Sequence, residues 1–150
     1  MNYCLGFIFN KGLDRVLLVK KNKGPANMAG RLNAIGGKVE KDEAGNEAME
    51  RECREETGLL ISDWKSFCCF GDSTYKVYCY YSITDDIYNF KQIEDEELKI
   101  YDIQQGLSAK SIPNYYVRYP RMANLDWLIP MAINHYLVLD KTTYFDIIEH

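Results

Sequence analysis

Three glutamates, Glu52, Glu55 and Glu56, are spaced three and four residues apart in a segment whose composition favours a helix from about Ala44 to Thr57. At about 100° of rotation per residue, their side chains share one face of that helix. Carboxylates placed in this way repel one another, and the helix dipole disfavours negative charge in the last turn. A divalent cation would relieve both penalties, because Mg²⁺ and Mn²⁺ prefer hard oxygen ligands.

The residues around these glutamates favour a metal site over the alternative, an exposed charge cluster balanced by Arg51 and Arg54. Gly36 and Gly37 precede the helix, and glycine allows the backbone to approach a ligand closely. After Gly37 come five residues and Glu43, then seven residues and Arg51, where the segment continues as RECREETGL. Stability of a helix alone does not require this spacing.

The pattern resembles the Nudix box, GX5EX7REUXEEXGU, in which U is a bulky apolar residue. Every fixed position matches, and only Cys53 is an unusual choice for U. The resemblance implies a hydrolase that cleaves a nucleoside diphosphate linked to another moiety, by attack of water on a pyrophosphate phosphorus. It also implies an α+β Nudix fold, which is an α/β/α sandwich with a mixed sheet and the box as a loop–helix–loop.

The resemblance further implies a role for each residue of the box. The implied metal ligands, for Mg²⁺ or alternatively Mn²⁺, are the carbonyl of Gly36 and the side chains of Glu52, Glu55 and Glu56. The implied catalytic set is Glu43, Arg51 and Glu52. In this set Glu43 supports the metal shell, and Arg51 orients a carboxylate through a charge-assisted hydrogen bond.

The identity of the general base stays open between Glu52 and an acid outside the box. In Nudix enzymes the outside acid comes from a loop between later strands. Here Glu94, Asp95, Glu96 and Glu97 cluster in such a segment. Glu94 and Glu97 are the candidates, against the alternative that this segment is an exposed acidic turn.

A longer stretch bears on the substrate. The segment RVLLVKKNKGPANMAGRLNAIGGKVEKDE resembles the oxidised purine nucleoside triphosphatases, which carry GRWNGFGGKV where this chain has GRLNAIGGKV. In that family the asparagine reads the purine base; Asn33 occupies its position, and an amide offers both a donor and an acceptor. The alternative is that Asn33 only satisfies backbone groups of its loop.

Lys38 and Asn124 are the other candidate substrate-binding residues. The resembling family places an acidic pair just before its final helix to discriminate between purines. Asn124 and Leu125 stand there in this chain. We therefore expect base selectivity to differ from that family or to be looser.

The predicted activity is Mg²⁺-dependent hydrolysis of a nucleoside triphosphate, including modified purines such as 8-oxo-dGTP, to nucleoside monophosphate and pyrophosphate. One alternative is a hydrolase of ADP-ribose, a dinucleoside polyphosphate or another NDP-X compound. The other is a non-catalytic nucleotide-sensing module, against which the intact box argues.

Composition sets the broad class. The 150 residues are 47% hydrophobic and 27% charged, which indicates one globular domain spanning residues 1–150. The net charge of −4 and the scattered basic residues argue against a nucleic-acid polymer as partner. No apolar run reaches the ~20 residues of a membrane span, and the first residues do not resemble a signal peptide, so we expect a cytoplasmic protein. The resemblance leaves a homodimer open.

The remaining expectations concern secondary structure and cysteines. Expected strands are Tyr3–Phe9, Arg15–Lys20, Leu32–Ile35, Trp64–Gly71, Tyr75–Thr84, Ile100–Ile103 and Thr143–Ile148. The strand at Leu32–Ile35 runs into a break at Gly36 and Gly37, after which Lys38–Glu40 is its candidate continuation. A second helix is expected at Asn124–Leu139, a turn at Asp85–Asn89 and one helical turn at Asp95–Lys99. Gly58 suits the left-handed position that ends the first helix. The five cysteines lack metal or disulfide spacing and are expected to be buried thiols.

Overall fold

The computed structural model describes residues 1–24, 26, 29–93, 96–103, 124–138 and 145–148. Its strands are β1 (Asn2–Phe9), β2 (Arg15–Lys21), β3 (Arg31–Asn33), β4 (Ile35–Lys38), β5 (Lys65–Gly71), β6 (Lys76–Ile83), β7 (Glu97–Asp102) and β8 (Phe145–Ile148). The helices are α1 (Gly45–Thr57), the short 3₁₀ helix η1 (Asp85–Asn89) and α4 (Leu125–Val138). Within these described ranges, no helix is long and apolar enough to cross a membrane.

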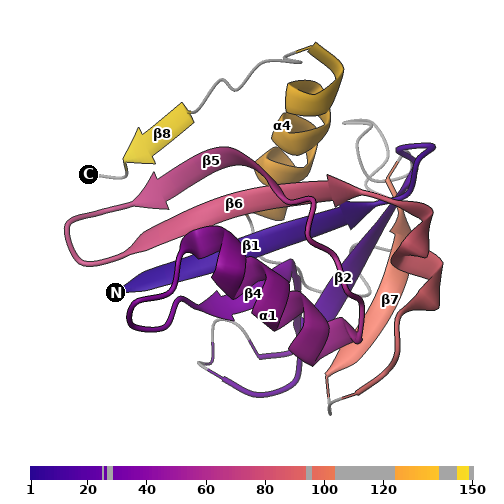
Figure 1. The fold of residues 1–150 in the computed structure, drawn as a ribbon, viewed down its shortest axis with the longest axis horizontal. Coiled ribbons are helices and arrows are strands. Elements are labelled where there is room, and N and C mark those ends of the chain that lie inside the picture. Colours follow the sequence, from indigo (N-terminus) through magenta and orange to yellow (C-terminus); the bar gives the residue numbers. More distant parts are fainter. Residues whose placement is uncertain (25, 27–28, 94–95, 104–123, 139–144, 149–150) are drawn as a thin grey trace.

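All eight strands belong to one mixed sheet (Figure 1). The main order is β3-β2-β1-β6-β5-β8, with β4 added on β1 and β7 on β2. The β1–β6 and β5–β8 pairs are parallel and the other pairs are antiparallel. The expected hairpin-like pairing of the first two strands and the closing edge strand are both confirmed.

The strands β1 and β2 pair only near one end, at Ile8 with Leu17 and at Phe9 with Val16. Farther along, β1 pairs with β4 while β2 pairs with β3. Since β3 and β4 are separated only by Ala34, residues 31–38 pass from one diverging strand to the other. This crossing places β4 beside α1.

Strands do form around the expected Leu32–Ile35, but the expectation that the glycines break them, with Lys38–Glu40 as the continuation, is wrong. The interruption falls at Ala34, and Gly36 and Gly37 lie inside β4. Glycine is needed at position 36 because β4 packs closely on β1. A Cβ on Gly36 would run into the backbone carbonyl of Cys4 on β1. Gly36 also has a φ of +146°, which glycine tolerates far better than other residues. The glycine pair therefore belongs to the strand that faces the candidate site.

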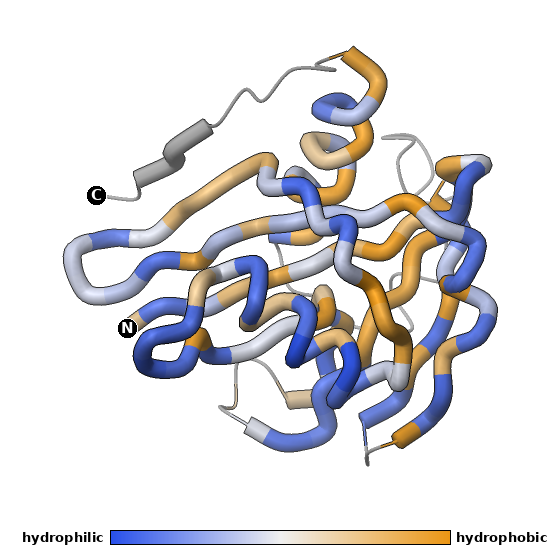
Figure 2. Tube along the Cα trace, viewed as in Figure 1, coloured by the Kyte–Doolittle hydropathy of each residue, from blue (hydrophilic) through white to orange (hydrophobic). Residues whose placement is uncertain are grey.

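The helices α1 and α4 cover opposite faces of the sheet, so the predicted α/β/α arrangement is confirmed (Figure 1). The apolar positions of α1 join one buried cluster, which includes Ala48, Met49, Cys53, Cys4, Ile8, Val19 and Leu98. The apolar positions of α4 join the other, which includes Leu125, Leu128, Ala132, Phe7, Phe67 and Tyr81. Figure 2 shows α1 as largely hydrophilic, because only a narrow stripe of it reaches the core.

Both long helices fall within one residue of their predicted bounds. The chain enters α1 at Ala44, whose backbone N–H donates to the Glu47 side chain at 2.8 Å. It leaves α1 at Gly58, which has the predicted left-handed conformation with a φ of +72°. At the start of α4, the Asn124 carbonyl accepts from the Leu128 N–H at 2.9 Å.

The helical turn expected at Asp95–Lys99 is wrong. Residues from Glu97 onward form β7, which pairs with β2 and places Leu98 opposite Val19. Leu98 is buried under α1, so burial of alternate side chains outweighs the acidic local composition. The turn expected at Asp85–Asn89 is η1, a 3₁₀ helix. All five cysteines are buried and free, as expected.

Candidate metal and pyrophosphate site

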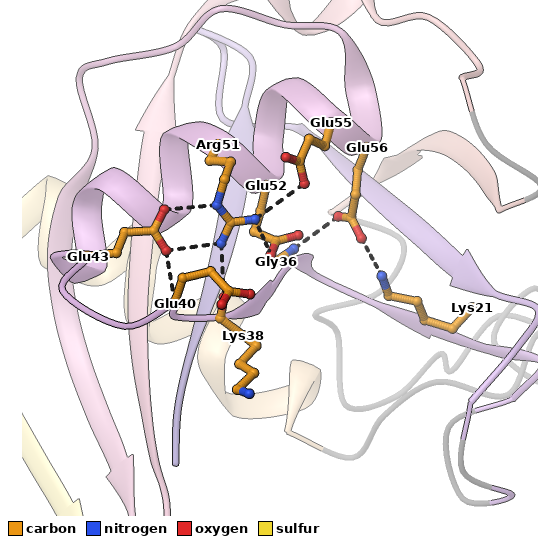
Figure 3. Close-up of polar contacts among 9 residues, drawn as sticks. All are labelled: Lys21, Gly36, Lys38, Glu40, Glu43, Arg51, Glu52, Glu55 and Glu56. Carbon is orange, nitrogen blue, oxygen red and sulfur yellow. Dashed lines mark hydrogen bonds and ion pairs between the residues drawn. The ribbon is translucent and has the colours of Figure 1, made fainter.

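Arg51 is the centre of the hydrogen-bond network on α1 (Figure 3). Its Nε and Nη2 donate to the two carboxylate oxygens of Glu43 at 2.8 and 3.0 Å. Its Nη1 donates to Glu52 at 2.8 Å and to Glu55 at 3.2 Å, and Nη2 also donates to the Lys38 carbonyl at 2.9 Å. The five N–H groups of the guanidinium are thus all engaged, which fixes its orientation.

Glu43 links this arginine to the loop before the helix. Its carboxylate also accepts from the backbone N–H of Glu40 at 2.9 Å. The hydrogen bonds from Arg51, and then that from Glu40, hold the pKa of Glu43 below its ordinary value. Hydrogen bonding to Glu43 in turn raises the pKa of Arg51 far above its ordinary value. Both side chains therefore stay charged around neutral pH.

Glu52 lies against the glycine pair of β4. Its side chain is 15% exposed, and a Cβ added to Gly37 would lie 2.5 Å from Glu52 Oε1. At Gly37 the close neighbour is the carboxylate of Glu52, and the expected approach of this backbone to a ligand stays a prediction. Only glycine at position 37 leaves room for the Glu52 side chain in this position.

Glu56 is the most deeply buried carboxylate of the group, with 8% of its side chain exposed. One of its oxygens accepts from the Gly36 N–H at 3.0 Å, and the other bonds the ammonium of Lys21 (Figure 3). Lys21 donates as well to Glu96, at 3.0 Å. Burial raises the pKa of Glu56 to about 7, against the opposing effects of Lys21 and the Gly36 N–H. Burial lowers the pKa of Lys21, but its two carboxylate partners raise it above the ordinary value overall.

The donor set suits a divalent cation in its chemistry. In the described part of the chain, no three acidic, histidine or cysteine side chains converge as a ready cluster. Glu52 and Glu55 instead bond Arg51, and Glu56 bonds Lys21. Their hard oxygens are those that Mg²⁺ or Mn²⁺ selects, and Glu52 and Glu56 are largely shielded from water. A cation bound here would balance charge that Arg51 and Lys21 balance now.

The three candidate substrate residues do not meet at one place. Asn33 is buried and pairs with Val19, whose side chain lies under α1, so Asn33 faces the α1 side of the sheet. Its Oδ1 accepts from the Ala34 N–H at 2.9 Å, which is the backbone role considered above. Asn124 precedes α4, which packs on the other face, and within the described residues its Oδ1 is buried without a hydrogen-bond partner.

Lys38 contributes its backbone to the Arg51 network. Its carbonyl accepts from Arg51, whereas its exposed side chain points away from the carboxylates (Figure 3). A phosphate bound beside Glu52 and Glu56 through a cation would therefore meet the Lys38 side chain only after a change of rotamer.

Of the candidate acids outside the box, Glu94 lies beyond the described residues, as does Asp95. Glu97 is in β7 with an exposed side chain. Glu96 is the acid that reaches the site, through Lys21. The sequence alone did not identify Lys21 or Glu96 as residues of this site. The alternation of side chains along β2 could have placed Lys21 there. Leu17 and Val19 lie under α1, and Lys21 is the next residue on the same side of the strand.

Comparison with known proteins agrees with this geometry. A family model for the NUDIX domain matches residues 4–118. The chain therefore belongs to the NUDIX domain family and is a Nudix pyrophosphohydrolase. Members of this family generally use a divalent metal.

Three solved structures illustrate the shared fold. A MutT structure, from work on the proteins of Aliivibrio salmonicida and Vibrio cholerae, is 21% identical with a TM-score of 0.64, over 85% of this chain and 94% of that one. A mutator MutT protein from Bacillus halodurans is 19% identical with a TM-score of 0.63, over 98% and 88%. The NUDIX domain of Shewanella oneidensis NrtR, complexed with ADP-ribose, is 15% identical with a TM-score of 0.63, over 91% and 88%.

Proposed function

We propose that this enzyme hydrolyses nucleoside triphosphates, including modified purines such as 8-oxo-dGTP, to nucleoside monophosphate and pyrophosphate, with Mg²⁺ or Mn²⁺ as cofactor. The observation that carries the proposal is the position of Arg51. It orients Glu52 while it is itself held by Glu43, next to the glycine pair against which Glu52 lies. The likeness of GRLNAIGGKV to the oxidised purine nucleoside triphosphatases supports the choice of substrate.

The residues of the box divide the work of the reaction. The divalent cation, when bound, supplies charge neutralisation of the phosphates and a bound water of lowered pKa. Glu52, Glu55 and Glu56, with the carbonyl of Gly36, are the proposed ligands. Arg51 keeps the carboxylate of Glu52 turned toward Gly37, and the burial of Glu52 limits the access of bulk water.

The step itself is a displacement at phosphorus. A new bond forms from a water oxygen to phosphorus, and the bond to the bridging oxygen breaks, so that pyrophosphate leaves from the nucleoside monophosphate. Glu52 is the proposed acceptor of the water proton within the box. Glu94 and Glu97 remain the alternatives outside it.

Recognition of the nucleoside is proposed to involve Asn33. Asn33 faces the same side of the sheet as the residues under α1, so a base read by Asn33 and a pyrophosphate held through a cation at Glu56 would lie on one face. Lys38 is proposed to contact the phosphates after its side chain turns. The location of Asn124 beside α4 gives its proposed part in base reading no support.

The products formed from a panel of nucleotides test this proposal. With purified protein and Mg²⁺, we expect pyrophosphate from dGTP or 8-oxo-dGTP. AMP from ADP-ribose, with no pyrophosphate from any triphosphate, would replace the proposal with the NDP-X alternative. Nucleotide binding without turnover of any substrate would instead indicate a sensing module.

A further inference from the structure

Lys21 joins two carboxylates that are far apart in the sequence. Its ammonium bonds Glu56 of α1 and also Glu96, which directly precedes β7, at 3.0 Å. All three side chains are largely shielded from solvent, with exposed fractions of 15% for Lys21, 8% for Glu56 and 19% for Glu96. Ion pairs that are shielded in this way interact more strongly than surface pairs.

The two oxygens of Glu56 have different partners. One accepts from the N–H of Gly36, which is fixed in β4, and the other bonds the Lys21 ammonium. The backbone donor cannot leave without disrupting the strand, whereas Lys21 sits on a flexible stem with three donors. Of these two partners, Lys21 is therefore the one that a cation at the Glu56 carboxylate can displace.

We propose that Lys21 is a displaceable counter-ion of Glu56, and that Glu96 is a positioning residue that takes over the Lys21 ammonium when a divalent cation binds. This inference rests on the proposed metal role of Glu56. Because Glu96 already bonds Lys21, the transfer needs only the loss of the contact between Lys21 and Glu56. The ammonium stays paired throughout, so no charge is left buried and unbalanced.

Two consequences follow for metal binding. Lys21 competes with the metal, since both are cations that bind the same carboxylate. Glu96 weakens that competition, because it offers Lys21 another partner. Substitution of Lys21 and substitution of Glu96 should therefore change metal affinity in opposite directions.

The test measures Mn²⁺ binding to the whole protein by EPR of free Mn²⁺, at fixed pH and ionic strength. Lys21→Met should lower the dissociation constant roughly tenfold, the size of one hydrogen bond to a shielded charged group. Glu96→Gln should raise it several-fold. Lys20→Met is the matched control, because it removes the same charge from the next residue of β2, on the opposite side of the strand.

The double variant separates a contact from general charge. If Glu96 acts through Lys21, Glu96→Gln should change the constant by no more than about twofold in the Lys21→Met background. An equal effect of Glu96→Gln in both backgrounds would overturn its positioning role. If Lys20→Met tightens binding as much as Lys21→Met does, the counter-ion role is overturned too.

Thermal unfolding provides a second readout. Without metal, Lys21→Met should have a lower Tm than the wild type, and saturating Mg²⁺ should raise its Tm by more. If Lys21→Met does not fold, Glu96→Gln alone still decides, since unchanged Mn²⁺ affinity in that variant contradicts the transfer. A wild-type protein that binds no Mn²⁺ would overturn the proposed metal site itself. Wild-type binding with no response to these substitutions would overturn only the counter-ion.

Discussion

Arg51 and Glu43 are joined by two parallel hydrogen bonds, Nε to Oε1 at 2.8 Å and Nη2 to Oε2 at 3.0 Å. The pair ties the loop before α1 to the middle of that helix, eight residues on. The remaining donors of Arg51 are thereby aimed at Glu52, Glu55 and the Lys38 carbonyl. Glu43 thus acts on the site through Arg51, without being a metal ligand in this arrangement.

This pair should make stability depend on acid pH. The pKa of Glu43 in the folded protein lies below its ordinary value of 4.5. Its contribution to stability is therefore fully present above about pH 4.5, and it is lost as the pH falls through the lower folded-state pKa. Glu43→Gln should be less stable than the wild type at pH 7, and the difference should shrink toward pH 3. Urea denaturation at both pH values measures this, and a difference that stays constant would contradict the assignment.

Glu56→Gln should separate folding from turnover. The amide oxygen of glutamine can still accept from the Gly36 N–H, and Lys21 keeps Glu96 as a partner, so we expect a native fold by circular dichroism. Loss of the negative oxygen should lower turnover by at least about 100-fold, with weaker Mg²⁺ dependence. Glu50→Gln, on the exposed side of α1, is the control and should keep normal turnover. Wild-type rates from Glu56→Gln would remove Glu56 from the metal site.

The adjacent glycines of β4 should respond differently to alanine. In Gly36→Ala the new Cβ meets the backbone of Cys4, which cannot move aside cheaply, so stability should fall by more than about 2 kcal/mol. In Gly37→Ala the three atoms nearest to the new Cβ all belong to the end of the Glu52 side chain, which can move aside more easily than backbone. The fold should therefore persist, while displacement of Glu52 lowers turnover on the order of 100-fold. Melting temperature and initial rate, measured on both variants, check the contrast.

The residues of the Nudix box could be predicted from the sequence because they lie close together along the chain. One helix carries Arg51, Glu52 and Glu56, and Glu43 lies two residues before its start, so spacing alone groups them. Gly58 likewise marks the helix end by its own backbone preference. The α/β/α arrangement came with the family resemblance rather than from the strand patterns.

The structural features that the sequence did not predict depend on contacts between segments that are distant along the chain. The break at Ala34 arises because β3 and β4 have different partner strands. No local sequence pattern predicts this change of partner. Lys21 meets Glu56 and Glu96 across 35 and 75 residues. The acidic run before Leu98 favoured a helical turn until pairing with β2 imposed a strand. In each case the long-range partner overrides the local preference.

The last prediction distinguishes two roles of Asn33. Its Oδ1 accepts from the Ala34 N–H, so Asn33→Ala removes both this bond and any contact with a base. Asn33→Asp keeps an acceptor for Ala34 but loses the amide donor. If Asn33 reads the base, Asn33→Asp should raise KM for purine triphosphates roughly tenfold with little change in kcat. The buried carboxyl should lower Tm whichever role Asn33 has, so KM is the deciding measurement for this variant. If Asn33 serves only its loop, Asn33→Ala should lower Tm, and Asn33→Asp should leave KM unchanged for every purine tested. Steady-state kinetics with GTP, dGTP and 8-oxo-dGTP, together with melting curves, decide between the two.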